Sequence, residues 1–280
     1  MAKSLTKVAL IGCGAIGTVL AEAVDSGRAG ETSLVAVFDV VPKSVERLVK
    51  HLKHHRPKGY LDFEQFLKES EADIIVEAAS QEAVKLYAEQ VAKAGKSIMI
   101  MSVGALLNEA LRSRIEAAAK KAGCRVIVPS GAIGGIDAIK AARLGGLERV
   151  TLTTRKNPDS LKYSPYFQKV VKDPSKMKGP VVVFEGAAEE AVKAFPANVN
   201  VSAVLSLAGI GGAKTVVRIV ADPSATRNIH EIEAEGEFGR LTVRLENIPH
   251  PENPRTSYLA VLSAIETLRS ITSRDIRIGT

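Results

Sequence analysis

The chain has 280 residues, of which 46% are hydrophobic and 25% charged, with a formal net charge of +7. This balance is typical of a soluble globular protein with one large or two modest domains. No stretch approaches the roughly 18 consecutive apolar residues of a membrane-spanning helix. Two cysteines, Cys13 and Cys124, are too few for a disulfide framework or a zinc site, so both are expected to be small packing residues.

The basic residues are spread along the chain, without aromatic interleaving or a long basic run. We therefore expect neither a nucleic acid nor a membrane as a partner. A basic surface would instead favour an anionic cofactor and an anionic substrate. The N-terminal segment Met1–Lys7 runs directly into an apolar strand and leaves no room for a signal peptide, which predicts a cytoplasmic protein.

A glycine turn, Gly12-Cys13-Gly14-Ala15-Ile16-Gly17, follows the apolar run Val8–Ile11 and leads into an apolar helix. In this strand–turn–helix context the G-x-G-x-x-G spacing predicts dinucleotide binding. Gly12 permits the tight turn, Gly14 lets a pyrophosphate approach the backbone, and Gly17 allows close helix packing. Ala15 and Ile16 open the helix, whose N-terminal N–H groups and dipole favour phosphates.

An acidic residue ends the second predicted strand, Ser33–Asp39. Asp39 is placed to accept hydrogen bonds from the adenosine ribose, which favours NAD over NADP. The nearby Lys43 would weaken that preference, so either cofactor remains open. The alternative for Asp39 is a turn or helix-capping role.

Strands and helices alternate through the first half of the chain, which predicts a parallel sheet with right-handed crossovers. The strand Asp73–Ala79 has the small residues Ala78, Ala79 and Ser80 at its carboxyl end, where a nucleotide would lie. The other elements expected here are helices at Pro42–Lys53, Leu61–Ser70, Glu82–Ala94 and Asn108–Ala122 and strands at Ser97–Ser102 and Cys124–Val128.

Three histidines, His51, His54 and His55, invite a metal-binding interpretation because two are spaced i, i+4. Lysines and arginines surround them in the sequence, so we expect a solvated basic face and no metal site.

The pattern changes after the glycine-rich junction Pro129–Gly135. We expect a dinucleotide-binding domain over residues 1–131, a mixed α+β substrate and dimerisation domain over 132–251, and a C-terminal helix within 252–280 that packs back on the first domain. The whole is thus an α/β protein with a Rossmann-type doubly wound sheet and a second domain.

Asn157–Lys178 is expected to be a flexible loop. Further strands are expected at Arg149–Lys156, Val181–Glu185, Thr215–Val220, His230–Gly236 and Gly239–Leu245, and helices at Ile136–Leu144, Ala187–Ala194, Asn198–Ala208 and Tyr258–Ile271.

Candidate chemistry in the second half rests on a few polar residues. His230, at a strand start, is a natural general base near neutral pH, whereas His250, between two prolines, is expected to be structural. Arg155 and Lys156 follow a Thr-rich strand and could bind carboxylates. Of Asn198 and Asn200, one would cap a helix and the other would be free for an amide such as nicotinamide.

Taken together, several stretches resemble the L-aspartate dehydrogenase family over nearly the whole chain. The resemblance rests on Gly12–Gly17, Glu77–Gln81, Ser130–Gly135, Leu152–Lys156, Phe195–Val201 and Asn228–Ile232.

The resemblance implies oxidation of L-aspartate to iminoaspartate with NAD or NADP. The imine then hydrolyses to oxaloacetate and ammonia or serves as a precursor for NAD biosynthesis. It further implies that His230 is catalytic, that Ala132 and either Asn198 or Asn200 contact the cofactor, and that the protein is a homodimer. Two substrate carboxylates require cations and hydroxyls, for which Thr154, Arg155 and Lys156 are the candidates.

Two alternatives stand beside this interpretation. A homoserine-dehydrogenase-like oxidoreductase would be expected to use lysines that we cannot place in this sequence. A non-catalytic NAD-binding sensor would need the glycine turn but neither His230 nor the Thr154–Lys156 cluster. Sugar dehydrogenases of similar layout carry Glu-Lys-Pro where this chain has Met101-Ser102-Val103.

Overall fold

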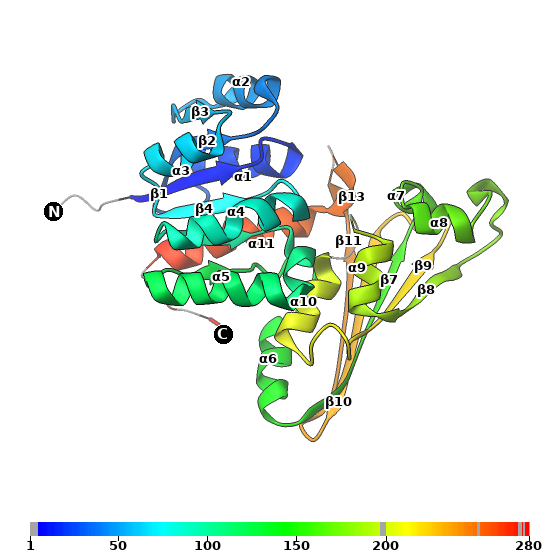
Figure 1. The fold of residues 1–280 in the computed structure, drawn as a ribbon. Coiled ribbons are helices and arrows are strands. Elements are labelled where there is room, and N and C mark those ends of the chain that lie inside the picture. The colour runs from blue at the N-terminus through cyan, green and yellow to red at the C-terminus, as the bar shows by residue number, and fades with distance from the viewer. Residues whose placement is uncertain (1–4, 197–199, 251–252, 274–275, 277, 280) are drawn as a thin grey trace. The chain divides into compact units, whose positions relative to one another are not determined.

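A computed structural model describes residues 5–196, 200–250, 253–273, 276 and 278–279. It divides into two compact units (Figure 1). The first comprises Met1–Pro129 and Val261–Ile278, and the second comprises Ser130–Ala260 and Gly279–Thr280. None of the described helices is long and apolar enough to cross a membrane.

The first unit contains a six-stranded sheet in the order β3-β2-β1-β4-β5-β6. Every neighbouring pair runs parallel, and β1 lies at the centre where the strand order reverses. This confirms the expected doubly wound nucleotide-binding sheet. The strands are β1 (Thr6–Ile11), β2 (Thr32–Phe38), β3 (Lys58–Tyr60), β4 (Ile74–Glu77), β5 (Ser97–Ile100) and β6 (Val126–Ile127).

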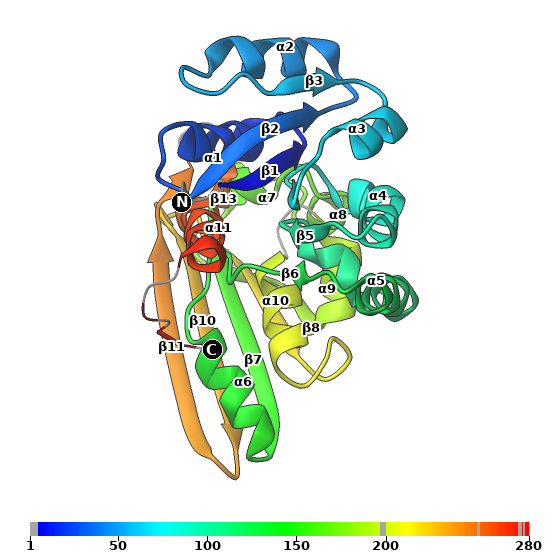
Figure 2. The ribbon, with the colours of Figure 1, turned by 90° about the vertical axis from the view of Figure 1, so that its left-hand side faces the viewer.

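Helices cover both faces of this sheet. Figure 2 shows α1 and α11 on one face and α3, α4 and α5 on the other. Side chains of Asp62, Ser80 and Asn108 accept hydrogen bonds from the first turns of α3, α4 and α5, as expected of N-cap residues. The helices are α1 (Ala15–Asp25), α2 (Pro42–His51), α3 (Phe63–Glu69), α4 (Gln81–Lys93), the 3₁₀ helix η1 (Val103–Leu107), α5 (Glu109–Ala122) and α11 (Tyr258–Thr272).

The C-terminal helix α11 completes the core of the first unit. Val261, Ala264, Ile265 and Leu268 belong to one buried cluster with residues of β1, β2 and α1. Their i, i+3, i+4, i+7 spacing gives α11 an apolar stripe, and this stripe is buried in the cluster on one face of the sheet.

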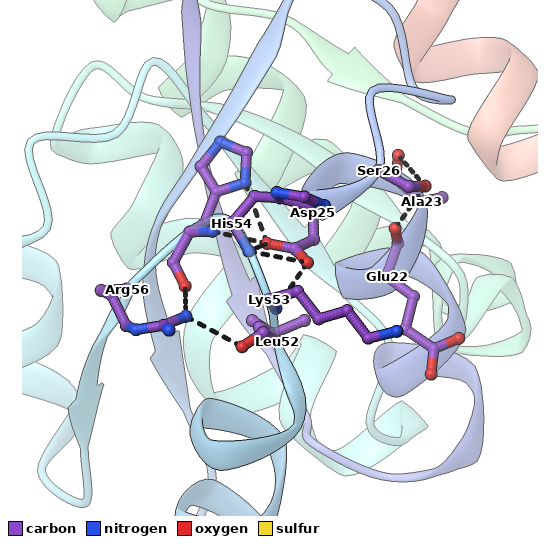
Figure 3. A network of polar contacts seen from close by, with 9 residues as sticks. Glu22, Ala23, Asp25, Ser26, Leu52, Lys53, His54 and Arg56 are labelled. Carbon is purple, nitrogen blue, oxygen red and sulfur yellow. Dashed lines mark hydrogen bonds and ion pairs between the residues drawn. The ribbon is translucent and has the colours of Figure 1, made fainter.

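A buried carboxylate joins the end of α1 to the loop after α2 (Figure 3). Asp25 accepts hydrogen bonds from the backbone N–H groups of Lys53, His54 and His55, at 2.6–3.2 Å. Burial alone would raise the pKa of Asp25, but these bonds lower it from 3.8 to about 2. The carboxylate therefore holds the loop that leads into β3.

The second unit contains a five-stranded mixed sheet in the order β11-β10-β7-β9-β8. Only β7 and β9 pair in parallel, and the other neighbours are antiparallel. Figure 1 shows α6, α9 and α10 on one face of this sheet. The elements are α6 (Ile136–Leu144), β7 (Leu147–Lys156), β8 (Val181–Ala187), α9 (Ala188–Ala194), α10 (Asn200–Ala208), β9 (Val216–Ala221), β10 (Asn228–Gly236), β11 (Gly239–Asn247), β12 (Pro249–His250) and β13 (Asn253–Ser257).

The opposite sheet face carries exposed arginine–glutamate pairs, and we call it the charged face. It arises because residues alternate between the two faces of a strand, here apolar toward the helices and charged away from them. The ion pairs are Arg149–Glu235, Arg218–Glu185, Arg227–Glu246, Arg240–Glu233, Arg244–Glu231 and Arg244–Glu246.

The segment Asn157–Lys178 is not the irregular loop that we expected. It contains three short helices, α7 (Pro158–Leu161), α8 (Pro165–Val170) and η2 (Pro174–Lys176), which begin after Asn157, Ser164 and Asp173. Each of these residues accepts a hydrogen bond from its helix, and each is followed by proline. A capping side chain before an N1 proline is a helix-start signal, and it outweighs the polar composition. The strand β3 was also missed.

Candidate active site

The glycine turn forms a bend that suits a dinucleotide. Gly12 has a φ of +100°, and a Cβ there would lie 2.8 Å from the carbonyl oxygen of Ala78. A Cβ at Gly17 would overlap the carbonyl oxygen of Gly12, so both positions require glycine. At Gly14, by contrast, a Cβ would meet nothing within 4 Å. Open space therefore lies where a pyrophosphate would approach the backbone.

The helix that follows the turn is open at its N-terminus. Gly14 is the N-cap of α1, no side chain caps the first turn, and that turn holds no acidic residue. Ala15 and Ile16 start the helix and are partly exposed. Free N–H groups and the positive end of the helix dipole therefore fit the phosphates of a dinucleotide.

Asp39 lies against the glycine turn. Its carboxylate accepts hydrogen bonds from the backbone N–H groups of Cys13 at 2.7 Å and Val41 at 2.9 Å. Arg47, an exposed residue of α2, donates from Nη2 to the carbonyl oxygen of Cys13 at 3.2 Å. Lys43 is exposed in the first turn of the same helix. Asp39 and Arg47 thus both contact the glycine turn, and Arg47 was not foreseen from the sequence.

Glu77, at the end of β4, organises the neighbouring strand ends. It accepts hydrogen bonds from the N–H groups of Ala79 and Ser80 at 2.8 and 2.9 Å, and from the N–H and hydroxyl of Ser102 at 3.0 and 2.9 Å. The four hydrogen bonds lower the pKa of Glu77, but burial raises it by more, so the net shift is upward. These bonds fix the exposed residues Ala79 and Ser80. They lie beside the glycine turn, because Gly12 of the turn packs closely against Ala78.

In the second unit, His230 and Thr154 face each other across neighbouring strands. The register of β10 and β7 pairs them directly, and Thr154 Oγ1 lies 3.0 Å from His230 Nδ1. Both residues are buried, with 2% and 3% of their surface exposed. Burial, reinforced by the charge of Lys156, lowers the pKa of His230 to about 3. The imidazole is therefore neutral near pH 7 and can accept a proton.

Lys156 shares this site. It lies two residues after Thr154 on β7, which places both on one face of the strand. Only 3% of its surface is exposed, and burial lowers its pKa to about 8.

Arg155 is not brought together with these residues. It alternates to the other face of β7, where its Nη1 donates to the Asp222 carboxylate at 2.9 Å. Asp222 also accepts from the N–H and hydroxyl of Ser224. The structure therefore does not bring the three residues of the expected clamp together, because strand geometry places the Arg155 side chain on the face opposite to Thr154 and Lys156.

Three further residues expected at the cofactor lie in the second unit. Ala132 is buried in the glycine-rich loop before α6, and its carbonyl oxygen accepts from Asn247 Nδ2 at 2.9 Å. Asn200 is exposed at the start of α10. Asn198 lies outside the described residues. Asn247, at the end of β11, carried no signal in the sequence, yet it fixes the loop that presents Ala132.

Three of the remaining histidines are paired or packed. His51 Nε2 lies 2.6 Å from Glu22 Oε1, and His55 Nδ1 lies 3.2 Å from Asp25 Oδ1. His250 is buried, with its ring edge-on to Tyr258. Within the described part of the chain, no group of three or more His, Cys, Asp or Glu residues could hold a metal ion. Burial, then the Asp39 charge, raises the pKa of the Cys13 thiol to about 12, which makes it unreactive.

The sequence matches two described families. Residues 137–271 match "Aspartate dehydrogenase, C-terminal", and residues 12–129 match "Homoserine dehydrogenase, NAD binding domain". The L-aspartate dehydrogenase of Methanosarcina mazei is 48% identical over 276 residues, which cover 99% of this chain and 100% of that protein.

Solved structures show the same relationship. The aspartate dehydrogenase of Thermotoga maritima superposes with a TM-score of 0.77 at 32% identity, over 98% of this chain and 99% of that chain. A protein of gentamicin A biosynthesis, solved in complex with NAD, gives a TM-score of 0.58 at 14% identity, over 100% and 90% of the chains. The second likeness shows the fold alone.

The fold and these matches define an NAD(P)-dependent oxidoreductase with an N-terminal NAD-binding domain. More closely, the chain belongs to the L-aspartate dehydrogenase family, since full-length relatives are 40–48% identical to it. The family resemblance noted in the sequence is thereby confirmed, and neither of the two alternatives is needed to explain the chain.

Proposed function

We propose that this protein oxidises L-aspartate to iminoaspartate with NAD or NADP as the hydride acceptor. The observation that carries the proposal is the buried His230–Thr154 pair beside Lys156, in a chain 48% identical to a known L-aspartate dehydrogenase. A neutral base and a lysine on one face of the sheet suit a substrate that carries an ammonium group and two carboxylates.

The first unit supplies the cofactor site. The open space at Gly14 and the uncapped N-terminus of α1 would hold the pyrophosphate, and Ala79 and Ser80 would line the nucleotide. When bound, the cofactor accepts the hydride that leaves Cα of the substrate. Ala132 and either Asn198 or Asn200 are the further proposed cofactor contacts, in accordance with the family resemblance.

His230 is the proposed base for the hydrolytic step. If His230 Nδ1–H donates to the Thr154 hydroxyl, the lone pair of Nε2 is available to a water molecule. As the water oxygen attacks the iminium carbon, its proton passes to Nε2. In that arrangement Thr154 orients the imidazole and does not itself exchange a proton with the substrate.

The test is His230→Ala, assayed by absorbance at 340 nm with L-aspartate and each cofactor. Turnover should fall by about 100-fold or more, the usual loss on removing a general base. NADH binding, followed by fluorescence, should stay unchanged. A variant that keeps nearly full kcat would remove His230 from the mechanism, and a wild-type protein inactive on L-aspartate would refute the proposed activity.

Both cofactors are proposed to be used. Asp39 would accept hydrogen bonds from the ribose hydroxyls of NAD, whereas Arg47 and Lys43 offer cations to a 2′-phosphate. Asp39→Ser should improve the KM for NADP relative to NAD, and Arg47→Gln should do the reverse. If the KM values for NADP and NAD changed equally, or in the directions opposite to these, Asp39 and Arg47 would not determine the choice of cofactor.

The assembly is proposed to be a homodimer that forms through the charged face. Arginines and glutamates alternate there, so a twofold axis can set each sign against its opposite in a second copy. Arg244→Glu should weaken the dimer, and light scattering measures this directly. A monomeric wild-type protein would contradict the proposal.

A further inference from the structure

Lys156 is an unusual residue for the end of a strand. Lysine is rarely buried, yet this side chain is 3% exposed and occupies the same face of β7 as Thr154. Thr154 in turn lies 3.0 Å from His230, so the three side chains form one cluster across β7 and β10. Two groups able to exchange protons therefore share one site.

Two roles are open to a lysine in this place. A permanent cation could anchor a substrate carboxylate, but arginine is better suited to that task because it binds in two-point fashion and stays charged. An arginine is present at the adjacent position, and the strand turns it to the opposite face, toward Asp222. Position 156, on the same face as Thr154 and His230, holds lysine, the basic side chain that burial readily converts to a neutral amine.

We propose that Lys156 is a second catalytic residue, the base that takes a proton from the α-ammonium group of the amino-acid substrate. This inference rests on the proposed function. It divides two proton transfers between two residues, with Lys156 acting on the substrate nitrogen before hydride transfer and His230 acting on the attacking water afterwards.

The step is balanced in atoms and electrons. One N–H bond of the substrate ammonium breaks, its electron pair stays on the substrate nitrogen, and a new N–H bond forms at Lys156 Nζ. Nothing is oxidised or reduced in this step. The nitrogen lone pair then assists loss of hydride from Cα, and Lys156 later releases its proton to water.

The electrostatic surroundings favour this division. Burial lowers the pKa of Lys156 to about 8, whereas that of His230 falls to about 3, so the lysine is much the stronger base. On the other face of β7, Arg155 and Asp222 form an ion pair, and β9 places Ala221 opposite Lys156. The two carboxylates of a bound substrate would raise the pKa of both bases.

The experiment compares Lys156→Ala and Lys156→Arg with the wild-type protein. Both variants should lose about 100-fold in kcat/KM for L-aspartate, because arginine keeps the charge but cannot act as a base. Added methylamine should restore part of the activity of Lys156→Ala. It should not increase the activity of Lys156→Arg or of the wild-type protein. Lys214→Ala, which removes an exposed lysine of the same unit, is the matched control and should behave as wild type.

The pH dependence of the wild-type protein gives a test that needs no variant. Its kcat/KM should rise with pH through about 8, and that limb should disappear in Lys156→Ala. Near-normal turnover of Lys156→Arg, a loss confined to KM, or a wild-type profile flat from pH 7 to 9 would each overturn the proposal. These results all presuppose wild-type turnover of L-aspartate, so they are distinct from failure of the proposed function.

Discussion

The glycine turn and the His230 cluster are built in different ways. In the turn, backbone groups form the site, and glycines are required because a Cβ at Gly12 or Gly17 would collide with neighbouring backbone. In the cluster, three side chains from two strands form the site, and the backbone only sets their register. In the proposed function, the first arrangement binds the phosphates of a cofactor that many enzymes share, and the second determines which reaction follows.

The difference predicts that substitutions at two glycines of the same turn have different effects, one on cofactor binding and the other on stability. Gly14→Val should weaken NADH binding by about 100-fold, since losing phosphate contacts costs a few kcal/mol, while the melting temperature stays near wild type. Gly17→Ala should instead destabilise the protein by about 1–3 kcal/mol. Fluorescence titration and thermal melts separate the two effects. Equal loss of stability in both variants would contradict the distinction.

Asp25 provides a test of stability away from either site. Its pKa is about 2 in the folded protein and 3.8 ordinarily, so it contributes about 2 kcal/mol above pH 4, which is lost as the pH falls toward 2. Asp25→Asn should remove this contribution at pH 7 and flatten the acid limb of the stability curve. Urea unfolding at several pH values measures it. An unchanged curve would show that the carboxylate is not required to hold the loop after α2.

The hydrogen bond between Thr154 and His230 should matter less than His230 itself. Thr154→Val keeps the shape and removes the hydroxyl, so kcat should fall about threefold to tenfold, the value of one hydrogen bond. KM for L-aspartate should change little. If Thr154→Val matched the loss of His230→Ala, the hydroxyl would be part of the chemistry and not only a positioning group.

The smallest effect is expected at Arg155. Because its guanidinium pairs with Asp222 on the other face of β7, Arg155→Met should change the KM for L-aspartate by less than about twofold. Steady-state kinetics decide the matter. A large increase in KM would return Arg155 to the substrate site and contradict the separation of the two faces.

These contrasts also explain what could be read from the sequence. The parallel sheet of the first unit, apart from β3, and the glycine turn follow from local patterns, because spacing and composition determine them. The Thr154–His230 contact joins residues 76 positions apart, and only the register of β7 and β10 creates it. Family resemblance implied the role of His230, and Thr154 was a candidate for binding a substrate carboxylate, but composition and spacing alone could not place the two side chains in contact.

Other residues were missed for specific physical reasons. Strand alternation, visible in the sequence, would have separated Arg155 from Thr154 and Lys156. The capped prolines of Asn157–Lys178 were likewise readable as helix starts. Glu77, Arg47 and Asn247 act through hydrogen bonds to distant backbone atoms, for which no local pattern exists.

The position of α11 has a consequence for how the chain is made. Val261 and Leu268 belong to the core of the first unit, yet about 130 residues of the second unit are synthesised before them. At bacterial or eukaryotic ribosome speeds this is a delay on the order of 10 s. During that time the face of the sheet that α11 covers is bare, so the nascent first unit would be a natural client for chaperones, while the second unit can already assemble its own sheet.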